Sequence, residues 1–194
     1  MSKPPINLPE LTFLLGPNDP QKHALAHALR DRDPELFLCD LETPIREATS
    51  QLFFDGDFFN SGDLTKPESR SAKLLNTNET VQDWLTRFEA LLRLEFGTDI
   101  LGQLLAKRLD DEGTFQIFDR VLVTDVTNPA DIRPFGGLKH SELLVIHTGP
   151  LTTPLVPDIR TVWLAVPELE LRLAQLEREL ESATLPSGIK HSSA

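Results

Sequence analysis

Basic residues and cysteine are both scarce in this sequence. The 194 residues include 19 lysines and arginines against 30 aspartates and glutamates, giving a formal net charge of −11. Proteins that coat nucleic acids or bind anionic membranes need basic patches to neutralise phosphate, so we expect neither as a partner. A local basic pocket for one small phosphate ligand remains compatible with this charge. Cys39 is the only cysteine, which excludes an internal disulfide and a cysteine-rich zinc site.

Long apolar runs are lacking as well. No segment approaches the roughly 20 apolar residues that a spanning helix needs, and none resembles a signal peptide. We therefore expect a cytoplasmic protein. Its length suits one ordinary domain with a substantial core.

Short apolar runs alternate with helical patterns along the chain. After a proline-rich, irregular lead-in over residues 1–10, this alternation predicts a single α/β domain over 11–183, with a mainly parallel sheet flanked by helices. We expect strands at 11–16, 35–40, 120–126, 143–149 and 161–166, and helices at 20–32, 44–54, 167–183 and, with a break near Gly97, from 84 to 109.

Three segments extend this prediction. Residues 55–77 lack periodicity and predict a long loop, which could serve as a lid or substrate loop. The polar segment 184–194 predicts a disordered tail. A leucine stripe on the 167–183 helix predicts packing onto the domain's own sheet, with a homodimer or protein partner as the alternative.

The stretch "GPNDPQKH" (16–23) follows the first predicted strand and precedes a predicted helix. This layout is that of the phosphate-binding pattern G-x-x-x-x-G-K-[ST], in which glycines and a lysine cradle phosphate oxygens. Gly16 and Lys22 match it, but Gln21 replaces the second glycine and His23 the hydroxyl that holds magnesium. An ordinary turn leading into a capped helix remains the alternative.

Three further residues weaken a phosphate site in this stretch. Pro17 and Pro20 each lack the N–H that a cradle would use, and Asp19 adds negative charge beside it. The same Asp19 and Pro20 are typical of a helix start, as the cap and the first helical residue.

Acidic and basic side chains gather near the predicted strand ends. Asp40 and Asp125 each end an apolar run, so both could face the crevice where open α/β sheets bind ligands. There they could orient magnesium or a substrate hydroxyl, or cap the following turn. Arg46, Lys66 and Arg70 could supply positive charge nearby.

The remaining reactive side chains predict no separate site. His23 and His27 share a spacing that can chelate a metal, but no third ligand is evident, so we expect solvated helix histidines and no metal site. Cys39 has no activating partner in the sequence and is expected to pack as a small apolar residue.

Four later stretches add a resemblance that lies in their order. The stretches are "PIREA" (44–48), "GDLTKPE" (62–68), "EFGTDILGQLL" (95–105) and "VLVTDVTNPADIRPFGG" (121–137). Together with the loop at 16–23, they resemble the deoxynucleoside monophosphate kinases of tailed bacteriophages, small P-loop kinases of the adenylate-kinase type. The resemblance spans roughly residues 11 to 150.

This resemblance implies a three-layer P-loop kinase-like fold and transfer of the ATP γ-phosphate, with Mg²⁺, to a deoxynucleoside monophosphate or a modified relative. A phage-encoded protein would act in the host cytoplasm. The implied catalytic residues are Lys22 and Asp125. The implied ATP-binding residues are Gly16, Asn18, Gln21, Lys22 and His23, and the implied substrate-binding residues are Asp40, Arg46, Lys66 and Arg70.

The sequence also departs from the family at two arginine positions. Thr127 stands in place of the arginine of an Asp-Val-Arg motif, and Gly102 and Gln103 occupy the region where another arginine follows Gly-Thr-acid. Phosphoryl transfer depends on cations that neutralise the transferred group. We therefore expect an impaired kinase, or alternatively a catalytically degenerate member that binds a nucleotide or a protein.

Overall fold

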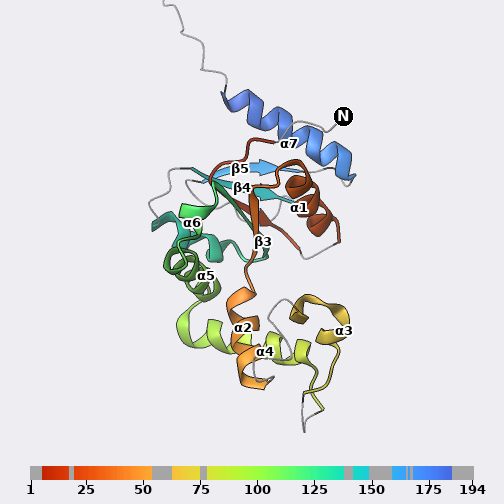
Figure 1. The fold of residues 1–194 in the computed structure, drawn as a ribbon, viewed down its shortest axis with the longest axis vertical. Coiled ribbons are helices and arrows are strands. Elements are labelled where there is room, and N and C mark those ends of the chain that lie inside the picture. Colours follow the sequence, from red (N-terminus) through yellow and green to blue (C-terminus); the bar gives the residue numbers. More distant parts are fainter. Residues whose placement is uncertain are drawn as a thin grey trace, which may run out of the picture.

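The computed structural model describes residues 6–17, 20–53, 63–74, 78–137, 142–148, 159–164, 166 and 168–184. Its centre is a sheet of five parallel strands in the order β2-β3-β1-β4-β5 (Figure 1). The predicted strands are confirmed, with shorter ends at β4 and β5. They are β1 (Leu11–Leu15), β2 (Leu36–Asp40), β3 (Arg120–Val126), β4 (Leu143–His147) and β5 (Arg160–Trp163).

Helices connect these strands. The predicted helix over 20–32 is confirmed, as are the helix near 44–54 and the break at Gly97, where the backbone φ is 106°. The α-helices are α1 (Pro20–Arg32), α2 (Thr43–Phe53), α3 (Pro67–Arg70), α4 (Val81–Phe96), α5 (Ile100–Asp111), α6 (Thr114–Ile117) and α7 (Leu169–Thr184), and the 3₁₀ segments are η1 (Asp63–Thr65) and η2 (Pro129–Gly137).

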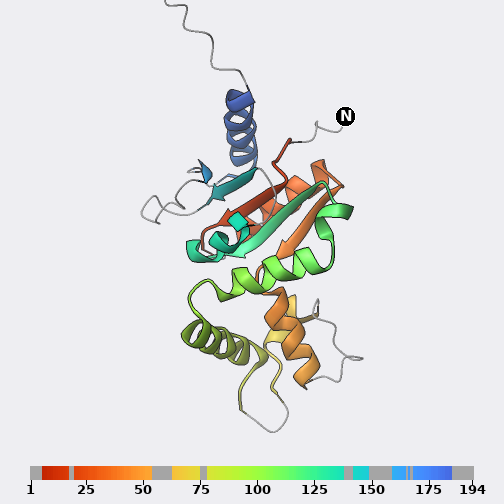
Figure 2. The ribbon, with the colours of Figure 1, turned by 90° about the vertical axis from the view of Figure 1, so that its left-hand side faces the viewer.

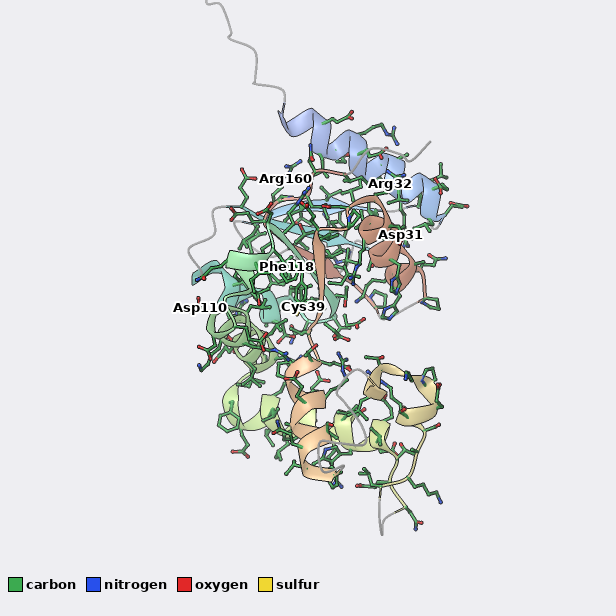
Figure 3. All side chains as sticks on the ribbon, viewed as in Figure 1. Asp31, Arg32, Cys39, Asp110, Phe118 and Arg160 are labelled. Carbon is green, nitrogen blue, oxygen red and sulfur yellow. The ribbon has the colours of Figure 1, made fainter. Side chains whose placement is uncertain are left out.

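The helices form two layers around the sheet, which makes the fold a three-layer α/β structure of the P-loop-like kind, as predicted. On one face, Leu14 of β1 packs in a common core with α1 and α7. On the other face, Phe13 packs with α5 and η2, and its ring meets Phe135 edge-on at 4.9 Å. An ion pair between Arg32 and Glu177 joins α1 to α7, and Figure 3 shows Arg32 at the end of α1 beneath α7.

The leucine stripe of α7 faces this core. Leu173, Leu176 and Leu180 are buried against the sheet and α1, whereas Leu171 on the outer side is 53% exposed. The predicted packing onto the domain's own sheet is confirmed. These three leucines are therefore not available to a homodimer or protein partner, which was the alternative expected for this stripe.

A lobe made of α2, α3 and α4 lies beyond the carboxyl ends of the strands (Figures 1 and 2). A reciprocal capping box starts α4, in which the Asp83 N–H donates to Thr80 Oγ1 and the Thr80 N–H donates to the Asp83 carboxylate. This pair satisfies two N–H groups that a helix start otherwise leaves unpaired. The lobe forms one wall of the crevice at the sheet edge.

Some predictions were wrong or fall outside the described residues. The described part of the predicted loop, 63–74, contains η1 and α3, so it is not an irregular loop throughout. Residues 55–62 and 75–77, the tail from 185 on, and Asn18 and Asp19 lie outside the described residues. Among the described helices, none combines the length and apolar character needed to cross a bilayer.

Helix α5 and the segment η2 approach each other closely, beside the lobe helix α4. A Cβ on Gly102 would lie 2.0 Å from the carbonyl oxygen of Asp131, so only glycine fits there. The buried Asp131 carboxylate accepts two bonds from Arg93 of α4, at 3.0 and 2.8 Å. Glycine and ion pair together hold α4, α5 and η2 in one arrangement.

We predict that Gly102→Ala lowers the free energy of unfolding by about 1 to 3 kcal/mol, because the new methyl group must displace backbone. Gly136→Ala in the same η2 segment is the control, since a Cβ there meets no atom within 4 Å. Urea unfolding of both variants tests this. Equal transition midpoints for the two variants would contradict the close approach.

Candidate functional site

The strand order directs attention to the carboxyl end of β1. In the sheet, β3 and β2 lie on one flank of β1, and β4 and β5 lie on the other. From β1 the chain passes through α1 to β2 on the first flank, and it later crosses from β3 to β4 on the second. Open α/β sheets bind ligands at such a switch point, outside the carboxyl ends of the strands. Gly16, the residue after β1, lies at this point.

Lys22 extends from the first turn of α1 to the ends of two central strands. Its side chain is buried, and Nζ donates to the carbonyl oxygens of Gly16, at 2.9 Å, and Val126, at 3.3 Å. The Gly16 N–H donates to the same Val126 oxygen, at 3.0 Å, and Gly16 has a φ of 149°, in the region that favours glycine. The structure thus brings the predicted Gly16 and Lys22 together at the crevice.

The described part of the 16–23 loop offers few main-chain donors to an anion. The Gly16 N–H is already engaged by Val126, and Pro17 and Pro20 have none. Further main-chain donors would come from the first turn of α1, where N–H groups have no partner within the helix. An anion at this loop would depend mainly on the start of α1.

Asp125 has the most unusual environment in the crevice. Its φ is 58°, a left-handed conformation that among non-glycine residues is most tolerated by asparagine and aspartate. Its carboxyl group lies near Asp40, which ends the adjacent strand β2. Burial, and then the charge of Asp40, raise the pKa of Asp125 to about 7, against the opposing effect of Lys22. Asp125 therefore holds a proton over much of the range up to neutral pH.

His23 lies at the solvent-exposed rim beside this pair. Its Nε2 is 3.4 Å from Asp125 Oδ1, and half of its side chain is exposed. The imidazole ring therefore lies within contact distance of the Asp125 carboxyl group. This contact differs from the magnesium-binding hydroxyl that the phosphate-loop pattern has at this position.

Glu42 is the site residue that the sequence reasoning missed. Its carboxylate accepts a bond of 2.7 Å from Arg70 and lies 3.4 Å from Arg46, which also bonds Asp40 at 2.6 Å. The Glu42 N–H donates to Asp40 Oδ1, at 2.9 Å. The sequence did contain a sign of this role, because Glu42 follows only two residues after Asp40, the acid that ends β2.

A cavity of about 290 Å³ joins these residues to the lobe. Of the predicted substrate residues, Asp40 and Arg70 line it, Arg46 is buried beside Asp40, and Lys66 is exposed between two lining residues. Its lining comprises His23, Asp40, Glu42, Asp125, Thr65, Pro67 and Arg70. Other hollows, of about 330 and 560 Å³, lie at the opposite edge of the sheet beside residues 6–10, away from Lys22 and the carboxyl pair.

The described side chains offer neither a metal-ligand cluster nor a reactive thiol. Across the described ranges, no cluster of three or more His, Cys, Asp or Glu side chains is arranged around a metal position. Cys39 is buried inside the fold (Figure 3), and burial raises the pKa of its thiol to about 12. Cys39 therefore packs as a neutral, unreactive side chain, as predicted.

The raised pKa of Asp125 predicts how stability depends on pH. Between about pH 4 and pH 7 the folded protein keeps a proton that the unfolded chain has lost, so the free energy of unfolding falls as the pH rises through this window. The slope from this group is about 1.4 kcal/mol per pH unit. Asp125→Asn keeps the left-handed backbone but cannot titrate, so the variant should gain stability relative to the original protein from about pH 5 to pH 8.

Urea unfolding at several pH values measures this difference, with the exposed Asp119→Asn as the matched control. Parallel stability curves for the original protein and Asp125→Asn would show that Asp125 ionises normally.

Comparison of the chain with protein-family models and with curated proteins finds no match to either. The geometry of the crevice is therefore the basis for the functional conclusion.

Proposed function

We propose that this chain is a nucleotide-binding phosphotransferase that moves the γ-phosphate of ATP to a nucleoside monophosphate. The observation that carries the proposal is the buried ammonium of Lys22 at the ends of β1 and β3, next to the Asp40–Asp125 carboxyl pair. A cation and two acids at the switch point of a parallel sheet suit a ligand that combines phosphate groups with Mg²⁺. The resemblance of the sequence to phage nucleotide kinases points the same way.

The two sides of the crevice would bind different phosphate groups. On the sheet side, Lys22 would exchange a bond to a carbonyl oxygen for one to a phosphate oxygen of ATP. On the lobe side, Arg70 would bind the phosphate of the acceptor, because it lines the cavity and a guanidinium can bind phosphate through two hydrogen bonds.

The carboxyl pair fits Mg²⁺ by its donor type. Mg²⁺ in phosphotransferases is commonly held by one or two carboxylates together with phosphate oxygens, so a cluster of three protein ligands is not required. Asp40 and Asp125 would supply those carboxylates, and the ion would neutralise charge on the phosphate oxygens. Ion binding would require Asp125 to lose its proton, because the raised pKa keeps this carboxyl group protonated up to about neutral pH.

A second candidate function is nucleotide binding without transfer. It is favoured by the partners that the cations already have, since Lys22 bonds two carbonyl oxygens, Arg46 bonds Asp40, and Arg70 bonds Glu42. A phosphate must displace these contacts. Each missing donor at a phosphoryl-transfer site lowers the rate on the order of tenfold to a thousandfold.

Turnover separates the two functions. We predict that the purified protein forms ADP from ATP and Mg²⁺ in the presence of at least one of the four common deoxynucleoside monophosphates. Lys22→Met keeps the volume of the side chain without its charge and should lower the rate by about 100-fold or more. Lys107→Met, at an exposed lysine of α5, should leave the rate unchanged.

Thermal unfolding with the same nucleotides completes this test, because a ligand that binds the folded state raises its melting temperature. A rise with turnover supports transfer, and a rise without turnover supports the binding function. If no nucleotide changes the melting temperature and no ADP forms, both proposals are wrong.

A further inference from the structure

Helix α4 is apolar on two faces. On its inner face Val81 and Leu85 are buried in the core. On its outer face Leu91 is 52% exposed and Leu94 is 80% exposed, with the small residue Ala90 beside them. Figure 2 shows α4 at the margin of the lobe, with no other helix in front of it. The outer face is therefore apolar, as contact surfaces often are, and none of the described elements covers it.

Two opposite charges flank this outer face symmetrically. Arg87 lies four residues before Leu91 and Glu95 lies four residues after it, and both side chains are exposed. With a rise of about 1.5 Å per residue, each lies about 6 Å from Leu91 along the helix axis, on the same side of the helix. Arg87 also bonds Glu79, at 2.5 Å, and its guanidinium lies 5.1 Å from the centre of the Trp84 ring. These contacts fix the position of the Arg87 guanidinium.

This arrangement is complementary to itself in only one orientation. When two copies of α4 pack antiparallel with Leu91 at the centre, Arg87 of each copy faces Glu95 of the other. A parallel pair would instead set like charges against each other. An interface on a two-fold axis needs a surface that complements its own copy, and this one has an apolar centre between two opposite charges.

We propose that the outer face of α4 is a self-association surface, on which a second copy of this chain binds with its α4 antiparallel. The apolar contacts of Leu91 and Leu94 would supply most of the affinity. The two Arg87–Glu95 pairs would set the orientation and oppose the repulsion expected between copies with a net charge of −11 each. This inference is independent of the proposed nucleotide chemistry.

Charge reversal tests the proposal directly. Analytical ultracentrifugation of the full chain should show a concentration-dependent dimer. Arg87→Glu and Glu95→Arg should each weaken the dimer by about tenfold or more, because either change creates two like-charge contacts. A mixture of these two variants should form a heterodimer again. The two substituted side chains then carry opposite charges and face each other at one contact, and the unchanged Arg87 and Glu95 face each other at the second.

Two further variants serve as a second test of the surface and as a control. Leu94→Glu should also yield monomers, and it tests the surface without disturbing the contacts of Arg87. Lys107→Glu reverses an exposed charge on α5 and should leave the dimer intact, while circular dichroism confirms that each variant folds. A monomeric original protein, or a mixture of the charge variants that stays monomeric while Arg87→Glu and Glu95→Arg are folded, would overturn the proposal. Association with a different protein through this face, with no self-association, would overturn it too.

Discussion

The buried ammonium of Lys22 is the contact on which the centre of this structure depends. It joins the start of α1 to the carboxyl ends of β1 and β3 through the carbonyl oxygens of Gly16 and Val126. A buried cation is expensive unless polar atoms surround it, so the strand ends must stay close to α1. The same contact restrains the backbone at Val126 and therefore also at Asp125, the residue before it. Fold and crevice therefore share one constraint.

The crevice around this lysine is close to electrically balanced. Asp125 keeps a proton near neutral pH because it is buried beside Asp40, and the remaining acids have basic neighbours. A phosphate ligand would replace Asp40 and Glu42 as the partners of Arg46 and Arg70, so binding would exchange these ion pairs. At Lys22 it would replace a carbonyl oxygen. Such a site favours ligands that bring their own counterion, as a magnesium nucleotide does.

Much of the layered fold could be predicted from local patterns. The continuous apolar runs identified β1 and β3 because strands buried on both faces admit no polar alternation. Pro20 marked the start of α1, and Gly97 marked the break between α4 and α5, because each residue has a strong backbone preference. The short segments η1, η2, α3 and α6 escaped prediction because one or two helical turns leave too little periodicity to detect.

The candidate site was predictable only in its parts. Acids at the ends of β2 and β3 indicated a shared crevice, but the effect of Asp40 on the pKa of Asp125 depends on these strands being neighbours, which only the strand order reveals. The bonds of Lys22 to carbonyl oxygens and the role of Glu42 likewise depend on tertiary contacts. Helix α4 shows the same limit, because its leucines predicted a helix without showing which of them would remain exposed.

The most direct test of the central claim is hydrogen–deuterium exchange with and without a magnesium nucleotide. If the crevice binds phosphate, the amides at the start of α1, at the end of β3 near Asp125 and in α3 should exchange more slowly when ATP, Mg²⁺ and a nucleoside monophosphate are present. Unchanged exchange in these three segments, or protection confined to the opposite edge of the sheet near residues 6–10, would contradict the account.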